Sequence, residues 1–388
     1  MLKKVLFVEQ TVDGTIGGSH YCLLYLLQYL DRSLYKPLVI FYEKNALIEN
    51  FQRQCPVIIF KLFKFTTYRI KTVRKGINLF INLINIFRCY SFLKKNKIDI
   101  VHLNNSASGG YHTWLVACIS TGIPCITHER NFTRYPKTAL FSYLKNKYKG
   151  VLAVSNVIRD HMIAQGIHPH VAITVHDGID ADTFYKKVKK TRQEMIQEFG
   201  IQSDAVAIGL IGNIREWKGQ ELLIDALNIV QKTHPDFFCL LVGDTSKHTN
   251  ADREFAKRLI EKINKYGIAE RVILTGYRND IPDIINLLDL QINASIRPDP
   301  FPHVILEGMS LGKAVIATNL GGAVESIDDG QTGFLVPPDC HLLAEKIIVL
   351  MSDTQLRQSM SANAKKRVQL FSMTQTIQKI EEIYEKFT

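Results

Sequence analysis

The segment AVAIGLIGNIREWKGQELLIDALNIVQK, residues 205–232, decides the fold because its pattern changes partway along. Residues 205–212 form a continuous apolar run, which is typical of a strand buried on both faces of a parallel sheet. A loop with glycines follows, and from about residue 219 the apolar positions recur at helical spacing. Strand, glycine loop and helix in this order predict part of a βαβ unit.

The same alternation of strand-like and helical segments runs along the whole chain. It restarts after a basic stretch near 185–192, and a length of 388 residues exceeds one typical core. We therefore predict an α/β protein with two parallel-sheet domains, 1–182 and 195–371. A terminal helix, 372–388, follows, and packing back on the first domain is one arrangement open to it. The strand-like runs are 3–9, 35–43, 98–105, 123–129, 150–155, 171–179, 205–212, 237–244, 271–277, 290–295, 314–318 and 333–337.

The composition predicts a soluble globular protein in a reducing compartment. Hydrophobic residues make up 46% of the chain and charged residues 22%. The seven cysteines are scattered without a CxxC pair, which argues against a disulfide framework and a zinc site. The start of the chain leads directly into a strand-like pattern, so we expect no signal peptide. The expected location is the cytoplasm.

Positive charge is concentrated in the first half of the chain. The formal net charge is +11, and residues 50–98 contain eleven lysines and arginines but no acidic residue. Residues 130–159 form a second acid-free run. Such basic runs suit nucleic acid or an anionic membrane. No nucleic-acid reader motif is present, and the interleaved apolar residues favour a membrane surface.

The segment INLFINLINIFR, residues 77–88, has an amphipathic helical pattern. Asn78, Asn82, Asn85 and Arg88 fall on one stripe, whereas Phe80, Ile81, Ile84 and Phe87 fall on the other side. The apolar run is shorter than the roughly 20 residues of a membrane span. Two interpretations remain: a helix lying in a membrane interface, or a core helix with a solvated basic face.

Two loops of the first domain are candidates for ligand binding, because open α/β sheets bind ligands at the carboxyl ends of their strands. In VDGTIGGSH, residues 12–20, Gly17 and Gly18 precede a helix and allow a ligand to approach its free N–H groups. The alternative is a tight turn. In ITHERN, residues 126–131, His128 ends a strand and can hydrogen-bond a substrate, although such a histidine is also commonly structural.

Two loops of the second domain suit phosphate. GNIREWKGQ, residues 212–220, places Arg215 and Lys218 at a helix start, where two cations can bind a diphosphate. A solvated loop with surface charges is the alternative. NLGGAVESI, residues 319–327, repeats the strand, glycine and helix pattern with Gly321 and Gly322.

The segment RPDPFPHVILEG, residues 297–308, places two carboxylates around a helix start. Its prolines hold 297–302 extended, and Pro302 suits the first helical turn. Asp299 then lies in the loop and Glu307 about one turn into the helix, with free N–H groups between them. We expect carboxylates beside such donors to stay ionised, which disfavours an acid/base pair. The arrangement favours a clamp for a sugar nucleotide.

These motifs together resemble the family 4 glycosyltransferases, which are retaining enzymes of the GT-B fold. The second half carries the more specific matches: GNIREWKGQELLIDAL, LLVGD, LTGYRNDIPDII, RPDPFPHVILEGMSLGKAVIATNLGGAVE and DGQTGFLVPP. The first half matches more loosely, through GGSHYCLLYL, DIVHLNN, ITHE, AVSNVIRDHM and HDGIDADTF. The resemblance implies two Rossmann-like domains that face each other across a cleft, with the donor mainly on the second.

The resemblance also implies roles for individual residues. Glu307 matches the second Glu of an E-x7-E pattern and binds ribose hydroxyls, and Asp299 replaces the first Glu, which helps to hold the transferred sugar. Lys218 matches a lysine that contacts the diphosphate, and His128 a histidine that contacts the transferred sugar. The family usually has Arg in place of Asn213, and from its charge alone we expect the nearby Arg215 to substitute for that arginine. The remaining donor-binding candidates are Gly17, Gly18, Tyr277, Arg278, Phe301, Pro302, His303, Val304, Gly321 and Gly322.

The implied activity is transfer of a hexose, with retention, from a nucleoside diphosphate sugar to a hydroxyl of a glycan or lipid-linked acceptor. The leaving diphosphate accepts the acceptor's proton, so we expect no metal and no other cofactor. The expected setting is polysaccharide or glycolipid assembly, peripheral on the inner face of the plasma membrane. Alternatives are a sugar-nucleotide epimerase, a phosphorylase, or a sugar-binding module without catalysis.

Overall fold

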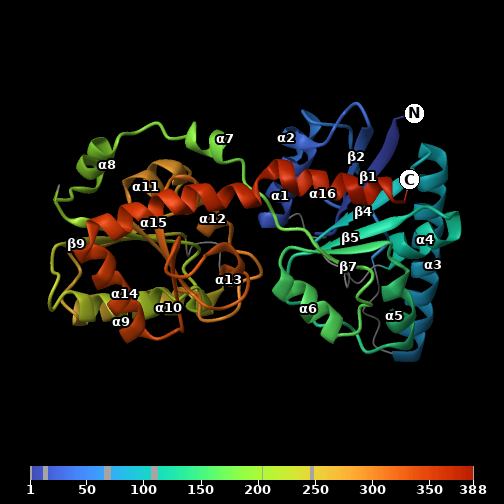
Figure 1. Cartoon of the computed structure of the whole chain (residues 1–388). Coiled ribbons are helices and arrows are strands. Elements are labelled where there is room, and N and C mark those ends of the chain that lie inside the picture. Colours follow the sequence, from blue (N-terminus) through green and yellow to red (C-terminus); the bar gives the residue numbers. More distant parts are fainter. Residues whose placement is uncertain are drawn as a thin grey trace. The chain divides into compact units, whose positions relative to one another are not determined.

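The structure, a computed structural model, consists of two compact units (Figure 1). The first unit comprises Met1–Asp177 and Met373–Thr388, and the second comprises Gly178–Ser372. The first unit is thus built from both ends of the chain. The residues that the structure describes are 2–11, 16–64, 71–105, 112–202, 204–244 and 249–387.

The first unit contains a parallel sheet in the order β3-β2-β1-β4-β5-β6-β7. The order reverses between β1 and β4, which pair directly, with Val5 opposite Ile100 and Glu9 opposite Asn104. This is the switch point at which open α/β sheets bind ligands. The strands are β1 (Lys3–Glu9), β2 (Tyr35–Phe41), β3 (Val57–Ile59), β4 (Ile100–Asn104), β5 (Cys125–Glu129), β6 (Gly150–Ala153) and β7 (Ala172–Thr174).

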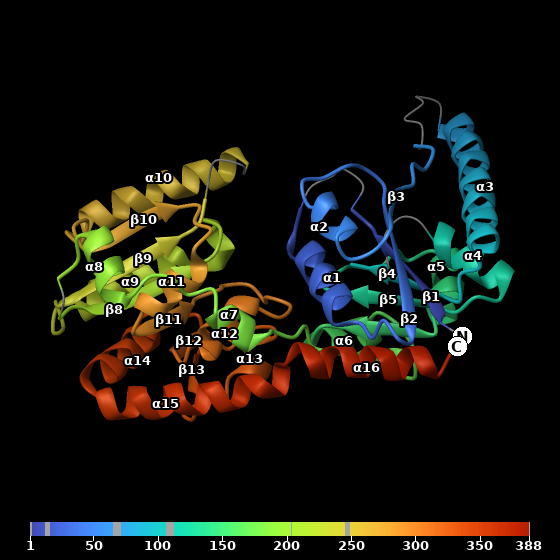
Figure 2. The same ribbon diagram turned by 90° about the horizontal axis from the view of Figure 1, so that it is seen from above.

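Helices from both ends of the chain complete the first unit. The C-terminal helix α16 packs beside α1, and its Ile380 and Tyr384 are fully buried in the same core as Leu23 and Leu27 of α1 (Figure 2). The apolar side of the terminal helix is therefore part of the core of the first unit. The helices are α1 (Gly18–Tyr29), α2 (Ile48–Gln52), α3 (Lys71–Asn96), α4 (Thr113–Thr121), α5 (Ala139–Leu144), η1 (Lys145–Lys147), α6 (Asn156–Ala164) and α16 (Met373–Glu385).

The second unit has its own parallel sheet, in the order β10-β9-β8-β11-β12-β13, which reverses between β8 and β11. Leu290 of β11 pairs with Ile208 of β8 in the centre of the sheet. The strands are continuous apolar runs because helices cover both faces. They are β8 (Val206–Ile211), β9 (Phe237–Val242), β10 (Val272–Gly276), β11 (Leu290–Asn293), β12 (Ala314–Thr318) and β13 (Gly333–Val336).

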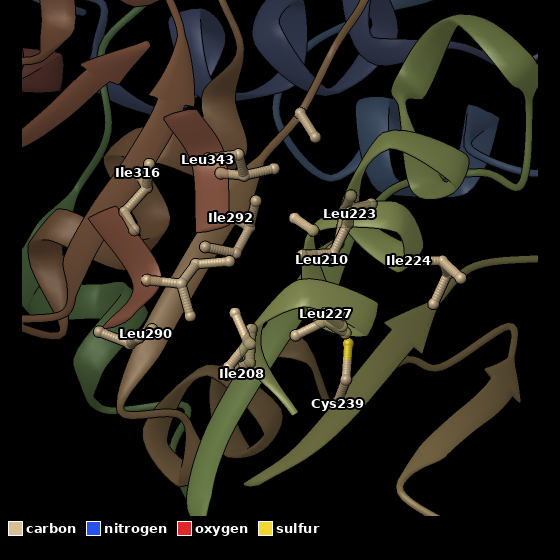
Figure 3. Packing of buried hydrophobic residues seen from close by; sticks show 14 of the residues in the cluster. Ile208, Leu210, Leu223, Ile224, Leu227, Cys239, Leu290, Ile292, Ile316 and Leu343 are labelled. Atoms are coloured by element: carbon tan, nitrogen blue, oxygen red, sulfur yellow. The ribbon is translucent and has the colours of Figure 1, made fainter. Parts of the chain in front are cut away.

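One face of this second sheet is covered by α9 and α14, as Figure 3 shows. Leu223 and Leu227 of α9 and Leu343 of α14 pack against Ile208 and Ile292 of the strands. The helices are α7 (Ala181–Tyr185), α8 (Arg192–Phe199), η2 (Glu216–Lys218), α9 (Gln220–Val230), α10 (Asn250–Lys265), α11 (Ile281–Leu287), α12 (His303–Ser310), α13 (Ala323–Ser326), α14 (Cys340–Ser352), α15 (Thr354–Arg367) and η3 (Val368–Phe371).

Helix α3 has the predicted amphipathic stripes, but its polar stripe faces the protein. Asn85 is fully buried, and its side chain accepts a hydrogen bond from the Phe63 N–H and donates one to the Phe63 carbonyl, at 2.9 and 3.0 Å. Phe80 and Phe87 are 65% and 68% exposed. The interpretation as a core helix with a solvated basic face is therefore wrong about which stripe of residues 77–88 faces the protein, although Arg74 and Lys75 are exposed. The polar stripe faces inward because the extended chain around Phe63 needs hydrogen-bond partners.

The apolar character of α3 also extends beyond the twelve-residue run on which the sequence analysis relied. Within the described ranges, Thr72–Asn96 is one helix long and apolar enough to cross a membrane by length and composition, and 17% of its apolar window is buried. Length and composition alone are weak support for a span, because core helices of soluble proteins also meet both criteria. The hydrogen-bonded polar stripe argues against a helix surrounded by lipid.

Candidate active site

The loops after β8 and β11 meet at the switch point of the second unit. Gly219 has φ +75°, and a Cβ there would lie 1.8 Å from the carbonyl oxygen of Ala294. The Ile296 N–H donates to the Trp217 carbonyl at 2.9 Å. Only glycine combines this left-handed conformation with so close an approach of two backbones. The contact brings Lys218 of the first loop beside the carboxylate of the second.

Lys218 and Asp299 form an ion pair between these two loops. The Lys218 Nζ donates to Asp299 Oδ2 at 2.7 Å and lies 4.2 Å from the centre of the Trp217 ring. Asp299 is 8% exposed, so the pair is largely shielded from water. The sequence analysis assigned both residues to the donor but did not anticipate that they contact each other. A donor diphosphate that binds Lys218 would compete with Asp299 for the ammonium group.

Gly321 and Gly322 hold the loop that carries Asp299. A Cβ at Gly321 would lie 2.1 Å from the Asp299 carbonyl oxygen, and one at Gly322 would lie 2.3 Å from that of Pro300. The Gly322 N–H donates to the Asp299 carbonyl at 2.8 Å. The glycine pair thus allows close packing against the backbone of residues 299 and 300. That it also binds the donor phosphate stays a prediction.

We expect Gly321→Ala to destabilise the protein by roughly 2–4 kcal/mol, because the positive φ of +62° and a backbone clash add together. Denaturant unfolding measures the loss. Gly330→Ala is the matched control, since its φ is +74° but no atom lies within 4 Å of the Cβ position. It should cost only about 1 kcal/mol. Equal losses in the two variants would contradict a tight packing of Gly321 on Asp299.

Glu307 is positioned by α12, which begins after Pro302. Pro302, predicted at the first helical turn, is the N-cap, with φ −72° and ψ 101°, and the helix begins at His303. Gln291 of β11 is fully buried and donates from Nε2 to the Val304 carbonyl at 2.5 Å. A Cβ at Gly308 would lie 2.2 Å from Gln291 Oε1. Helix α12 therefore sits directly against β11, which fixes where the Glu307 side chain starts. Gln291 was missed because its partners are distant in sequence.

The Glu307 side chain is partly buried and accepts no hydrogen bond from the residues that the structure describes. Burial raises its pKa from 4.5 to about 7, and the nearby Lys187 lowers it in part. Among the residues that the structure describes, none donates a hydrogen bond to this carboxyl. With a pKa of about 7, Glu307 is only about half ionised at neutral pH, which departs from the expectation that both carboxylates stay ionised; no N–H group of the described residues donates to it. The carboxyl is available to hydroxyl groups of a ligand.

The segment after β10 contributes one exposed aromatic side chain and one arginine that is already paired with two carboxylates. Tyr277 is 75% exposed. Arg278 donates to Glu198 at 2.7 Å and to Asp280 at 2.5 Å, and its guanidinium lies 5.4 Å from the centre of the Phe199 ring. These hydrogen bonds, first that to Asp280, raise the pKa of Arg278. Arg278 thus connects α8 to the start of α11, and Tyr277 is the more available group for a nucleobase.

The other donor-binding candidates of the second unit lie in the two segments that carry the ion pair, 212–220 and 297–308. Asn213 is exposed, and its carbonyl accepts a hydrogen bond at 3.0 Å from Gln220, which is fully buried. The sequence analysis missed this role of Gln220. Arg215 is partly buried, and its carbonyl accepts from the Lys218 N–H at 2.9 Å. Phe301 is buried against Phe371, with ring centres 5.6 Å apart. His303 and Val304 are partly buried in the first turn of α12.

Gly17 and Gly18 of the first unit lie in open space. Both are exposed, and no described atom lies within 4 Å of either Cβ position. Gly17 has an extended φ of −129°, and its N–H donates to His20 Nδ1 at 3.3 Å. No contact of the described residues requires glycine here, and open space at a helix start is what a ligand's close approach needs.

His128 belongs to a buried polar network at the carboxyl ends of β4 and β5. It is fully buried, and Arg130 Nη2 lies 3.4 Å from both His128 Nδ1 and Asn104 Oδ1. Arg130 also pairs with Asp177, and the His128 ring stacks on His102 with centres 5.6 Å apart. The sequence analysis missed Arg130, Asp177 and Asn104, although polar residues at the ends of neighbouring strands were a signal for two of them.

The network keeps His128 neutral. Burial, and then the positive charge of Arg130, lower its pKa well below 6.5. A guanidinium only donates hydrogen bonds, so Nδ1 of His128 is the acceptor and Nε2 carries the proton. His128 is therefore a hydrogen-bond donor at neutral pH, and an imidazolium is disfavoured.

Two family models match the chain, one in each unit. Residues 191–367 match the model described as Glycosyl transferases group 1, and residues 16–183 match Glycosyltransferase Family 4. A lipopolysaccharide core biosynthesis mannosyltransferase of Rhizobium meliloti, LpsB, is 28% identical over 54% of this chain and 59% of its own length. An Escherichia coli galactosyltransferase that acts on alpha-D-GlcNAc-diphosphoundecaprenol is 23% identical over 81% of this chain and 82% of its own length.

Solved structures share the fold over the whole chain. A glycosyltransferase from Rickettsia africae has a TM-score of 0.84 and 26% identity, covering 100% of this chain and 98% of that one. HepE of Anabaena in complex with UDP and glucose has a TM-score of 0.79 and 25% identity, covering 99% of this chain and 100% of that one. The predicted two-domain α/β architecture and the resemblance are confirmed. This chain belongs to the family 4 glycosyltransferases and has the GT-B fold.

Proposed function

We propose that this glycosyltransferase moves a hexose, with retention, from a nucleoside diphosphate sugar to a hydroxyl of a glycan or lipid-linked acceptor. The acceptor side is the cytoplasmic surface of a membrane, in polysaccharide or glycolipid assembly. The observation that carries the donor assignment is Glu307, a partly buried carboxyl that accepts no hydrogen bond from the described residues, on the helix that follows the Lys218–Asp299 pair. The complex of HepE with UDP and glucose and the names of the two curated relatives support donor and acceptor class.

In this proposal the donor binds by exchanging protein contacts for its own. The ribose hydroxyls donate to Glu307, and Tyr277 lies against the nucleobase. The diphosphate takes the Lys218 ammonium from Asp299, which then accepts a hydroxyl of the transferred sugar. Arg215 and the first turn of α12 add positive charge and N–H donors. The contact between Lys218 and Asp299 supports this exchange, because it brings together the loops after β8 and β11.

The transfer step needs no protein nucleophile. The bond between the anomeric carbon and the diphosphate oxygen breaks, and the acceptor oxygen bonds the same carbon on the same face. The acceptor's proton passes to the leaving diphosphate. Lys218 and Arg215 stabilise the developing negative charge, and we propose that no metal is needed. Neutral His128 is in this proposal a hydrogen-bond donor rather than a base.

A screen of nucleotide sugars for thermal protection tests donor binding. One nucleoside diphosphate sugar should raise the melting temperature, because ligand binding to the folded state stabilises it. The free sugar should not do so at equal concentration. With that donor and an acceptor, the product should keep the donor's anomeric configuration by NMR. Inversion would contradict the retaining step, and conversion of the donor without any acceptor would identify an epimerase.

The raised pKa of Glu307 predicts that donor affinity increases with pH. Hydroxyl groups bind the carboxylate better than the carboxylic acid, so the donor must displace a proton below the pKa of about 7. We expect roughly tenfold tighter binding at about pH 8 than at about pH 6. Calorimetry at the two pH values measures this difference. Glu307→Gln should abolish the pH dependence, and its persistence in that variant would assign the titration to another group.

A further inference from the structure

The solvent-facing side of α3 carries six large apolar side chains. Their spacing of three and four residues from Val73 to Phe87 places most of them on one side of the helix. Leu79, Phe80, Leu83 and Phe87 are 61%, 65%, 56% and 68% exposed. Scattered single hydrophobic residues are normal on a surface, but a contiguous row of this kind marks an interaction site. We call this row the α3 apolar face: Val73, Ile77, Leu79, Phe80, Leu83 and Phe87.

The opposite side of α3 is firmly attached to the first unit. Asn82 Oδ1 accepts a hydrogen bond at 3.5 Å from Thr113 of α4, and Asn85 bonds the backbone of Phe63. Arg88 donates to the Lys61 carbonyl at 2.7 Å, and its guanidinium lies 4.9 Å from the centre of the Phe63 ring. These contacts hold the helix with its apolar face outward. The exposure therefore results from specific polar contacts on the other side.

A second element of the first unit has the same character. Leu140 and Tyr143 of α5 are 59% and 62% exposed, and the Lys147 ammonium lies 4.8 Å from the centre of the Tyr143 ring. Figures 1 and 2 both show α3, α4 and α5 on the same side of this unit. Apolar side chains with cations beside them are typical of surfaces that meet lipid headgroups.

Charge identifies the occupant. Lys61, Lys64, Arg74 and Lys75 are exposed around the start of α3, and residues 50–98 contain no acidic side chain. An anionic surface complements this charge, and each lysine or arginine near such a surface contributes about 1 kcal/mol. A second copy of the chain fits less well, because pairing α3 with itself would bring together two surfaces with an excess of positive charge, in which Glu43 lies 3.8 Å from Lys64.

We infer that the α3 apolar face docks this enzyme on an anionic lipid bilayer, with α3 lying in the interface and its polar stripe still on the protein. This inference deepens the proposed membrane-side location and rests on it. A spanning arrangement is disfavoured, since lipid around the whole helix would strip Asn82, Asn85 and Arg88 of their partners. The phenylalanine and leucine side chains enter the headgroup boundary, and the flanking cations contact the lipid phosphates.

Sedimentation with phosphatidylcholine vesicles, with and without phosphatidylglycerol, tests the docking surface. The wild-type chain should bind the phosphatidylglycerol vesicles. The triple variant Phe80→Gln, Leu83→Gln, Phe87→Gln should bind them at least roughly tenfold more weakly, because three exposed apolar side chains no longer leave water on binding. The matched control replaces three exposed apolar residues of the second unit, Ile260→Gln, Leu342→Gln and Leu370→Gln, and should bind like the wild type.

A second variant and a second readout separate the possible failures. Lys64→Gln, Arg74→Gln, Lys75→Gln should also weaken binding to phosphatidylglycerol vesicles, most strongly at low salt. Protection by the donor, measured without vesicles, should be unchanged in both α3 variants, so that loss of docking is distinct from loss of the proposed reaction. Equal vesicle binding by wild type and the apolar triple variant would overturn the inference. A wild-type dimer that the triple variant breaks, without vesicle binding, would replace lipid by a second copy.

Discussion

Glu307→Ala should weaken donor binding by roughly a hundredfold or more, because a charged hydrogen bond contributes about 1.5–3 kcal/mol and the carboxylate can accept two. Glu307→Gln keeps one acceptor oxygen, and we expect it to lose roughly tenfold to a hundredfold. Isothermal titration with the protecting nucleotide sugar measures both. Glu345→Gln, on the exposed surface of α14, is the control and should bind the donor like the wild type.

The same variant distinguishes a donor clamp from an acid/base catalyst. A pKa of about 7 would also suit a proton-transfer group at neutral pH. If Glu307 transferred a proton, Glu307→Gln would retain donor affinity and lose turnover. Loss of affinity in Glu307→Gln, with turnover of the saturated enzyme less affected, supports the clamp. Unchanged affinity with abolished turnover would contradict it.

Glu307→Gln should also stabilise the apo protein at alkaline pH. The folded-state pKa of about 7 lies above the ordinary value of 4.5, so the folded state holds this proton more tightly than the unfolded state. The resulting stability is complete below about pH 4.5 and is lost as the pH rises to about 7. We expect a gain on the order of 2 kcal/mol for the variant at about pH 8, from denaturant unfolding. Little difference should remain at about pH 4.5.

Lys218→Met should reduce kcat/KM by roughly a thousandfold, because one preorganised charge-stabilising group commonly contributes a hundredfold to a thousandfold and Lys218 also binds the ground-state diphosphate. The change also leaves Asp299, which is 8% exposed, without its cation. An unpaired buried charge costs about 1–3 kcal/mol of stability. Steady-state kinetics and thermal unfolding measure the two losses separately.

The double variant Lys218→Met, Asp299→Asn separates these two roles of Lys218. Removing the carboxylate charge removes the unpaired group, so the stability should recover most of the loss. Activity should stay low, because the Lys218 ammonium no longer faces the diphosphate and Arg215 alone remains. Recovery of activity together with stability would mean that Lys218 serves only to neutralise Asp299.

The sheets could be predicted from the sequence because their strands are buried on both faces. Such strands read as continuous apolar runs, and β8 and β12 appear in this way at Val206–Ile211 and Ala314–Thr318. The short strand β3, Val57–Ile59, was missed because its three residues lie within the basic stretch 50–98 and lack a distinct run of their own. A strand of three residues is too short to give the apolar run by which the longer strands were predicted.

Residues of the site could be found singly, but their contacts could not. Lys218 and Asp299 are 81 positions apart, and their pairing depends on the order β8-β11 in the sheet. The contact of Gly321 with the backbone of Asp299 depends in the same way on β12 lying beside β11. Local sequence patterns predict where helices start and where glycine turns occur. Contacts between loops can be predicted only when the order of the strands in the sheet is known.

The burial of an individual side chain also could not be predicted from the local sequence pattern. The sequence showed carboxylates near free N–H groups and so predicted ionised forms, but burial of Glu307 raises its pKa instead. The stripes of α3 were visible in the sequence, yet which stripe faces the protein depended on the backbone of Phe63, 22 positions before Asn85. Amphipathicity alone gives two faces and does not say which one is buried.

Hydrogen–deuterium exchange with and without the protecting nucleotide sugar tests the central claim most directly, because it locates the donor. Donor binding should slow exchange in the loops at the carboxyl ends of β8, β11 and β12, at residues 212–220, 296–307 and 319–323. A cavity of about 380 Å³ lies at the amino ends of strands β8, β9 and β10 of the same sheet and is lined by Phe199, Phe237 and Arg271 among others. Slower exchange confined to the residues around that cavity, with unchanged exchange around Lys218 and Glu307, would contradict this donor site.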